Sequence, residues 1–265
     1  MSTNPEASAE LNAVGIPRKS VISKSRSVRE VFENAPHYLK SRRLDMMMRT
    51  EAVHTFAADI ERRRIMDIGC GDGSITLPLL TSTSQLTLLD LSSNMLARAR
   101  QNAPQELIKN VAFRNENFKD AVFEPGSFDL IVTVGVMAHV DSPGEFLRKI
   151  KMLLRPGGHV ILEFTDAYHL VGRIDRFFGW LKERIAPSKY ATNRLSAKQV
   201  MELLEQNNFQ VLVDFRYARV PIPGIQRILS VDLLGKCVRA VFGTSAQNRN
   251  AWLGNEHIYF LRAER

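Results

Sequence analysis

Three glycines and two aspartates form the segment of this chain best suited to holding a small ligand. Asp67-Ile68-Gly69-Cys70-Gly71-Asp72-Gly73 directly follows a short apolar run, and Asp90 ends the next one. Glycines in such a loop let the backbone turn tightly and leave no side chain between it and a ligand. The carboxylate of Asp90 can accept hydrogen bonds from both hydroxyls of a ribose, and the charge of Asp67 suits a ligand that carries an ammonium group. The pattern therefore predicts a cofactor cradle.

The sequence argues against a nicotinamide cofactor and against a metal. Ser74 stands where a dinucleotide fingerprint has a further glycine, and Asp67 adds a charge that this fingerprint does not need. The chain has two cysteines, Cys70 and Cys237, which excludes a disulfide scaffold and suits a reducing cytosol. No group of His, Cys or Asp residues has metal-ligand spacing, so we expect no metal.

Strands and helices alternate around the cradle. Apolar runs predict seven strands, at 65–68, 86–89, 111–113, 128–134, 159–164, 209–217 and 257–261. Helices are predicted between them at 74–80, from Ser92 or Ser93 through Ala99, at 143–154 and from Ser196 through Leu204. Right-handed crossovers then give an α/β fold with a doubly wound, Rossmann-like, mostly parallel sheet of seven strands.

The chain of 265 residues is long enough for one domain with a full core. We predict a mobile tail at 1–27 and a single domain at 28–265. That domain divides into an N-terminal helical cap at 28–60, a cofactor-binding core at 61–164, and acceptor-side helices and final strands at 165–265. A helical insert at 220–253 precedes the last strand.

Several motifs together resemble the class I S-adenosylmethionine-dependent methyltransferases. They are D-I-G-C-G-D-G at 67–73, L-L-D-L-S-S-N-M-L at 88–96, F-D-L-I-V-T-V at 128–134, A-H-V at 138–140 and R-P-G-G at 155–158. The resemblance covers about residues 28–164 well and the rest loosely. The segment from Val31-Phe32-Glu33-Asn34-Ala35 through Tyr38 is similar to the N-terminal helix of the small-molecule branch, which includes quinone-biosynthesis methyltransferases.

The resemblance implies S-adenosylmethionine as the cofactor and a cofactor site made of Tyr38, Asp67, Gly69, Cys70, Gly71, Gly73, Asp90, Leu91, Met95, Asn117, Phe118, Val134 and His139. Asp67 and the glycine loop would hold the methionine end and Asp90 the ribose. Leu91 and Met95 would pack on adenine. Asn117 stands where the family usually has an aspartate, so we expect weaker selectivity for adenine but retained binding.

Methyl transfer from a sulfonium needs alignment and exclusion of water more than it needs a proton transfer. A base is required only where the acceptor must lose a proton. His139 is the candidate base; the alternative is that it packs against the cofactor or caps the next helix. Asp166, Tyr168 and His169 follow the fifth strand and are candidates for acceptor contact, with plain polar surface as the alternative.

The net charge of +8 is unevenly distributed, because residues 65–164 are slightly acidic and the flanking segments are basic. This excess serves solubility or an anionic partner, but no basic motif typical of tight nucleic-acid binding is present. An apolar stripe at 170–185, with arginines among its members, fits a pocket lid, a core helix or a helix lying on an anionic membrane. Peripheral membrane contact therefore stays open, and so does the oligomeric state.

The sequence predicts a cytoplasmic enzyme that methylates a small apolar or amphipathic acceptor, which could also be anionic. Secondary metabolites, quinone-like compounds and prenyl compounds all fit. One alternative is an RNA or protein methyltransferase that uses the basic outer segments. Another is a member of the fold that binds the cofactor without methylating anything. The acceptor and the methylated atom stay open.

Overall fold

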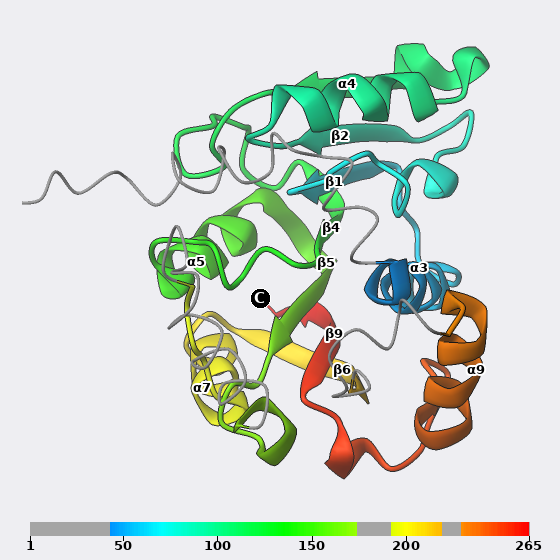
Figure 1. Cartoon of the computed structure of the whole chain (residues 1–265). Helices are drawn as coiled ribbons and strands as arrows, with labels where there is room; N and C mark the ends of the chain where they lie inside the picture. The colour runs from blue at the N-terminus through cyan, green and yellow to red at the C-terminus, as the bar shows by residue number, and fades with distance from the viewer. Residues whose placement is uncertain (1–42, 174–191, 219–228, 265) are drawn as a thin grey trace, which may run out of the picture.

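A seven-stranded sheet forms the centre of the computed structural model, in the strand order β3-β2-β1-β4-β5-β9-β6 (Figure 1). The structure describes residues 43–173, 192–218 and 229–264. Strand β9 pairs antiparallel with both β5 and β6, whereas the pairs among β1 to β5 are parallel. The strands are β1 (Arg64–Ile68), β2 (Gln85–Leu89), β3 (Val111–Arg114), β4 (Phe128–Thr133), β5 (Leu154–Thr165), β6 (Phe209–Tyr217) and β9 (Glu256–Ala263).

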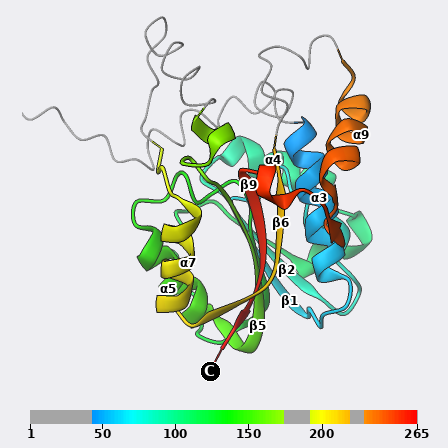
Figure 2. The same ribbon diagram turned by 90° about the horizontal axis from the view of Figure 1, so that it is seen from below.

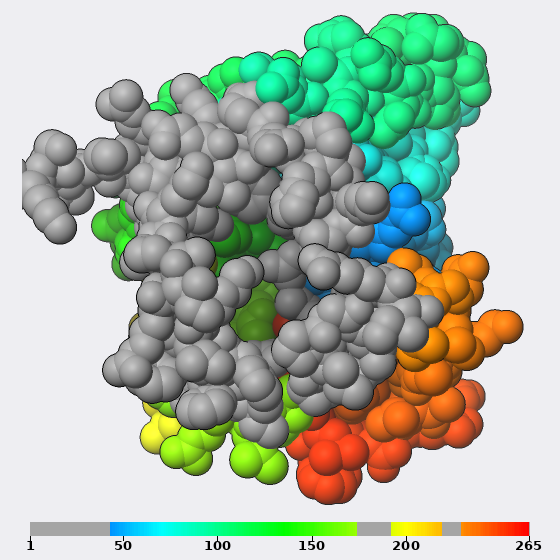
Figure 3. Space-filling view, in the orientation of Figure 1, coloured from blue at the N-terminus to red at the C-terminus, as the bar shows by residue number. Residues whose placement is uncertain are grey.

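Helices cover both faces of this sheet, which makes three layers. On one face lie α3 (Arg43–Ala57), α4 (Ser93–Asn102) and α9 (Val231–Phe242), and on the other lie α5 (Pro143–Leu153) and α7 (Ala197–Gln206). Figure 2 shows α3 beside α9, with α5 and α7 across the sheet. In the space-filling view, α4 lies at the upper edge of the molecule and α9 at the right (Figure 3). The predicted doubly wound α/β fold is confirmed.

Three serines begin three of these helices. The hydroxyl of Ser92 accepts a hydrogen bond from Met95 N at the start of α4, and Ser142 does the same for Glu145 N in α5. Ser196 and Gln199 form a capping box at the start of α7. Each cap satisfies a backbone donor that the first turn leaves without a partner. The serine caps predicted at the starts of α4 and α7 are therefore confirmed.

The core consists of two apolar clusters, one on each face of the sheet. Leu44 and Met48 of α3 and Leu234 of α9 lie in the first, and Leu147 of α5 and Val200 of α7 lie in the second. Strand β4 is buried along its whole length, as expected for a parallel strand in the middle of a covered sheet.

One predicted helix and one strand boundary are wrong. The segment 74–80 contains only the 3-10 turn η1 (Leu77–Leu79), because Pro78 has no N–H to continue an α-helical series. Strand β5 begins at Leu154, before the Pro156-Gly157-Gly158 turn that was expected to precede it, and its pairing with β4 shifts register there.

The predicted insert is helical only in part. It contains α9, the short hairpin β7 (Gly243–Thr244) and β8 (Gln247–Asn248), and the 3-10 turn η3 (Ala251–Leu253), while 220–228 lies outside the described residues. The remaining 3-10 turn, η2 (Gln105–Asn110), precedes β3. The predicted tail at 1–27, the part of the cap at 28–42 and most of the stripe at 170–185 also lie outside the described residues.

The parallel register brings the ends of three strands to one edge. Asp67 of β1 pairs with Leu88 of β2 on one side and with Val132 of β4 on the other. After β1 the chain continues to β2 and β3 in one direction, and β4 and β5 extend the sheet in the other. Such a change of direction leaves a crevice at the carboxyl ends of the strands, which is where open α/β sheets bind ligands.

Candidate active site

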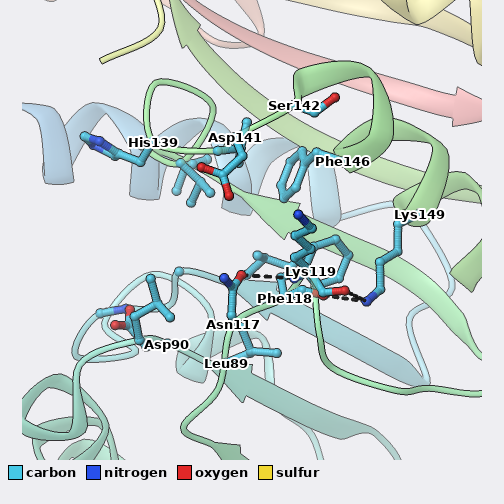
Figure 4. A pocket seen from close by; sticks show the side chains of 18 of the residues that line it. Leu89, Asp90, Asn117, Phe118, Lys119, His139, Asp141, Ser142, Phe146 and Lys149 are labelled. Carbon is cyan, nitrogen blue, oxygen red and sulfur yellow. Dashed lines mark hydrogen bonds between the residues drawn. The ribbon is translucent and has the colours of Figure 1, made fainter. Parts of the chain in front are cut away.

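A cavity of about 350 Å³ opens at the carboxyl ends of β1, β2 and β4. Its volume suits a single small ligand. Figure 4 shows Asp90, Asn117 and Phe118 on one side and His139, Asp141 and Phe146 on the other. The cavity is lined by residues from the ends of β1 and β2, from the loops that follow β1 to β4 and from α4 and α5: Ile68, Gly69, Gly71, Leu89, Asp90, Leu91, Met95, Asn117, Phe118, Lys119, Val134, Gly135, Val136, His139, Val140, Asp141, Ser142, Glu145, Phe146 and Lys149.

The glycine loop is held against the end of β2 by its backbone. Gly69 N and Cys70 N both donate to Leu89 O, at 2.8 and 3.1 Å. Gly69 has φ +72°, and a Cβ there would lie 2.5 Å from Val136 Cγ2. A side chain at this position would therefore collide with the loop after β4, so the close approach of the two loops requires glycine.

Gly73 lies outside the cavity, although the resemblance placed it in the cofactor site. It is buried beneath Leu77, and its N–H donates to Cys70 O at 3.0 Å. It does not line the larger cavity or the smaller one described below. Within the motif, Gly73 therefore closes the turn that begins at Cys70.

Asp90 lies at the end of β2, where both of its carboxylate oxygens accept backbone hydrogen bonds. Oδ2 accepts from Gly71 N at 2.9 Å and Oδ1 accepts from Ser92 N at 2.8 Å. These contacts fix the carboxylate at the cavity wall. Each oxygen has a second lone pair with which it can accept a further hydrogen bond from a ligand.

The loop after β3 forms the wall next to Asp90. Asn117 Oδ1 accepts from Lys119 N at 3.0 Å, so the side chain is held in a turn of its own loop. The buried ring of Phe118 meets the ring of Phe146 edge to face, with 5.2 Å between centroids. An aromatic wall of this kind offers a stacking surface to a flat apolar group such as a nucleobase.

A smaller cavity continues from the larger one toward α3. The two share Gly69, Gly71, Met95 and Val134, and the smaller one is also lined by Met46, Arg49, Asp67, Cys70, Asp72 and Ile75. The guanidinium of Arg49 and the buried carboxyl group of Asp67 therefore line the same small cavity. Sequence reasoning missed Arg49, because nothing in the local pattern of α3 shows which of its side chains meets the glycine loop.

Arg49 and Asp67 are both almost fully buried at this smaller cavity. The Arg49 guanidinium pairs with Glu163 of β5, with Nε 2.7 Å from Oε2. Asp67 Oδ2 accepts a hydrogen bond from Thr76 Oγ1 at 2.6 Å. Burial raises the pKa of Asp67 to about 7; the Thr76 hydrogen bond opposes this shift and the nearby Asp90 charge adds to it.

Cys70 lines the smaller cavity as a buried thiol. Burial raises the pKa of this thiol well above its usual range, and the charges of Asp67 and Asp90 raise it further. A thiol held protonated in this way is a poor nucleophile. Cys70 therefore contributes shape to the cavity and no covalent chemistry.

His139 lies in the loop between β4 and α5, at the cavity wall (Figure 4). Its backbone N–H donates to Val136 O at 2.8 Å. Asn193, in the segment before α7, clamps this loop. The Asn193 Nδ2 group donates to Met137 O at 3.1 Å and to Val140 O at 2.7 Å, and its N donates to Ala138 O at 2.7 Å. The loop carrying His139 is thus fixed on both sides of the histidine.

The three acceptor-binding candidates after β5 do not reach either cavity. Asp166 turns back on its own loop, where Oδ1 accepts from Tyr168 N at 2.8 Å and from His169 N at 3.1 Å. Tyr168 is exposed, and His169 Nε2 contacts Trp252 O at 2.9 Å. Local capping of the loop explains why these polar groups follow the strand. Tyr38, the remaining predicted site residue, lies outside the described residues.

Helix α5 supplies cavity residues that the motifs did not indicate. Glu145, Phe146 and Lys149 recur at spacings of one, three and four along the helix, which places them toward one side of it. Together with Asp141 and Lys119 they enlarge the cavity beyond the predicted set. The sequence predicts a helix at 143–154, but it does not show that polar side chains of this helix face the cavity.

The described residues contain neither a metal-ligand cluster nor a membrane-spanning helix. No group of three or more His, Cys, Asp or Glu side chains in the described ranges could hold a metal ion. Among the helices of those same ranges, none combines the length and the apolar character needed to cross a membrane.

Comparison with known proteins places this site in context. A family model described as "Methyltransferase domain" matches residues 61–215, more than half of the chain. The ubiquinone biosynthesis O-methyltransferase of Caulobacter sp. (strain K31) is 32% identical over 122 residues, which are 43% of this chain and 48% of that protein. The chain thus spans about half the length of the curated relatives it matches.

Solved structures share the fold at low identity. The magnesium protoporphyrin IX methyltransferase from Synechocystis PCC 6803, with bound SAH, has a TM-score of 0.59 at 16% identity and covers 89% of this chain and 98% of its own. The [4+2]-cyclase SpnF has a TM-score of 0.61 at 15% identity, over 91% of this chain and 96% of its own. At these identities the likeness is one of fold alone.

Proposed function

Because the chain belongs to the methyltransferase domain family, we propose that it binds S-adenosylmethionine and transfers the methyl group to a small apolar or amphipathic acceptor. The observation that carries this proposal is the pair of joined cavities at the switch point of the sheet. The larger cavity offers an aromatic wall and the Asp90 carboxylate. The smaller one offers a cation and a carboxyl group.

These features match the two halves of the cofactor. Phe118, Leu91 and Met95 would enclose the adenine, and the carboxylate of Asp90 would accept hydrogen bonds from the ribose hydroxyls. At the other end of the molecule, Arg49 would face the carboxylate of the methionine part and Asp67 its ammonium group. In this cavity the ammonium group of a zwitterion would give Asp67 an opposite charge, and its carboxylate would be a second partner for Arg49 beside Glu163.

When bound, S-adenosylmethionine supplies a methyl group on a positively charged sulfur, which makes it a ready electrophile. The chain itself would then have to hold the acceptor in line and keep water out. The loop carrying His139 is suited to this, because Asn193 fixes it with three hydrogen bonds.

His139 is our candidate for the group that receives a proton when the acceptor is a hydroxyl. A neutral imidazole can accept the proton that a hydroxyl loses when its oxygen is methylated. A neutral amine is nucleophilic without first losing a proton, so with such an acceptor His139 would only pack against the reactants.

The proposed acceptor class has two supports. The curated relative from Caulobacter sp. (strain K31) is, by name, a ubiquinone biosynthesis O-methyltransferase. The loop after β4 that carries His139 also brings apolar side chains to the cavity, those of Val136 and Val140. A quinone-like or prenyl compound, or a secondary metabolite of similar character, satisfies both.

Methyl-labelled S-adenosylmethionine tests this proposal. The full chain is incubated with the labelled cofactor and, in parallel, with a lipid-soluble metabolite extract, with total RNA and with unfolded protein. We expect label in the metabolite fraction and a loss of that signal in His139→Ala if the acceptor is a hydroxyl. Label in RNA or protein would show that the acceptor is a macromolecule and would contradict the proposed acceptor class. Cofactor binding without any labelled product would indicate a non-methylating member of the fold.

A further inference from the structure

We propose that Lys149 is a positioning residue that holds the adenine-facing loop 117–121 in its binding conformation. The inference rests on the proposed function, because it assigns the wall formed by Asn117 and Phe118 to the adenine. Lys149 belongs to α5, and its side chain crosses from this helix to the loop after β3 (Figure 4). No motif in the sequence singles it out.

Within the described residues, the Lys149 ammonium donates its hydrogen bonds to the backbone of this one loop. Its Nζ lies 2.5 Å from Phe118 O, 2.9 Å from Lys119 O and 2.6 Å from Ala121 O. A lysine ammonium has three donors, so these three carbonyls use them all. Hydrogen bonds from a charged donor are about twice as strong as neutral ones.

The contact also reaches the aromatic wall of the cavity. The ammonium lies 4.9 Å from the centroid of the Phe118 ring, and this ring meets Phe146 edge to face. Phe146 is three residues before Lys149 on the same helix. Helix α5 therefore holds the loop at its backbone through Lys149 and at its side chain through Phe146.

The side chains of Phe118 and Ala121 also hold the loop, because both are buried in the core on this face of the sheet. Its internal bonds, from Asp120 N and Ala121 N to Asn117 O and from Lys119 N to Asn117 Oδ1, shape the turn but do not anchor its backbone to the helix. Without Lys149, the carbonyls of Phe118, Lys119 and Ala121 would lose their common donor, and part of the ordering of this backbone would fall to the ligand. A ligand that must order its own site binds more weakly, because part of its binding free energy is spent on conformational entropy.

The same helix provides a matched control at Lys151. Its Nζ also donates to backbone carbonyls, those of Asn208 at 3.1 Å and of Glu264, and it lies 5.7 Å from the ring of Phe209. Burial lowers the pKa of both lysines. Lys151, however, anchors the ends of β6 and β9 and does not line either cavity.

The test compares Lys149→Met, Lys149→Arg and Lys151→Met. Calorimetry gives the Kd of each for S-adenosylhomocysteine and for S-inosylhomocysteine, whose base has a carbonyl in place of the adenine amino group. We expect Lys149→Met to weaken S-adenosylhomocysteine at least tenfold and to lower the preference for it over the inosyl compound at least threefold. Lys149→Arg should recover part of both, and Lys151→Met should leave both Kd values within twofold of the parent chain.

A thermal melt of each variant separates positioning from stability. Equal losses of Tm with unequal losses of affinity support the proposal. An affinity and a preference in Lys149→Met that match those of Lys151→Met would overturn it. If Lys149→Met does not fold, Lys149→Gln is measured in its place, and an unchanged preference there overturns the proposal while a lowered one supports it. A parent chain that binds neither compound would refute the proposed function, which is a separate result.

Discussion

The carboxylate of Asp90 accepts a hydrogen bond from the backbone N–H of Gly71, with 2.9 Å between Oδ2 and N. This bond joins the end of β2 to the middle of the glycine loop that follows β1. The second oxygen, Oδ1, accepts a hydrogen bond from the backbone N–H of Ser92, which is the N-cap residue of α4. Asp90 therefore links two loops at once while its side chain lines the cavity.

Replacing Asp90 by Asn should weaken the binding of S-adenosylhomocysteine. An amide would turn a donor toward either Gly71 N–H or Ser92 N–H, and it has less acceptor capacity for the ribose. A charged hydrogen bond is worth about 1.5–3 kcal/mol, so we expect a loss of roughly 10–100-fold in affinity, measured by calorimetry. Asp59→Asn, an exposed site after α3, is the control; an equal affinity in both variants would contradict the role of Asp90.

Asp67 should give the protein a pH-dependent stability. Its pKa is about 7 in the folded protein and near 3.8 when unfolded, so the folded state binds more protons between these values. Stability is then highest, with respect to this group, below pH 4 and falls as the pH rises through 7. We expect Asp67→Asn to remove this decline and to stabilise the unliganded protein by about 2–4 kcal/mol at pH 8.

The same substitution should harm cofactor binding, because the ammonium group would lose its anionic partner. Denaturant unfolding at pH 5 and pH 8, with S-adenosylhomocysteine titrations at both, checks the two effects together. In the parent chain, affinity should rise with pH as Asp67 ionises. A variant that is neither more stable at pH 8 nor weaker in binding would show that burial does not raise the pKa of Asp67 and that its carboxylate does not meet the ligand.

Arg49 should act only on the amino-acid end of the ligand. The double variant Arg49→Met with Glu163→Gln removes the cation without leaving a buried carboxylate unpaired. We expect it to weaken S-adenosylhomocysteine at least tenfold while 5′-methylthioadenosine, which lacks the amino-acid part, binds as before. Glu163→Gln alone is the control. Equal losses for both ligands would place Arg49 away from the methionine part.

Gly71 and Gly73 should separate binding from folding. A Cβ at Gly73 would lie 2.8 Å from Leu77 Cδ1 in the core, whereas a Cβ at Gly71 has no neighbour within 4 Å. Both residues have positive φ, so alanine adds strain of about 1 kcal/mol at each. We therefore expect a larger fall in Tm for Gly73→Ala and the larger fall in ligand affinity for Gly71→Ala. The reverse order would return Gly73 to the ligand site.

The sheet and its ligand edge could be predicted because they depend on local patterns. Buried runs such as 128–134, caps such as Ser92 and Ser196, and the glycine loop each act within a few residues. The Pro78 segment shows the limit of this approach, since an apolar period indicated a helix where the proline allows only one 3-10 turn. The identity of Asp90 as a cavity residue followed from its position at a strand end.

The residues that sequence reasoning missed are those that reach the site from a distance. Arg49 contacts the site through the packing of α3 and its pair with Glu163, which is 114 positions away. Lys149 and Phe146 depend on the rotation of α5 about its axis. Asp166, in contrast, has the right position at the end of β5 but spends its carboxylate on its own loop. No spacing rule distinguishes these cases, because tertiary packing decides each of them.

Calorimetric titration of the full chain with S-adenosylhomocysteine, and separately with NAD, tests the central claim most directly. The joined cavities predict saturable binding of S-adenosylhomocysteine in the micromolar range, with no heat from NAD. Absence of binding at millimolar S-adenosylhomocysteine, or binding of NAD in its place, would contradict the assignment of the glycine loop, Asp67 and Asp90 to a sulfonium nucleoside.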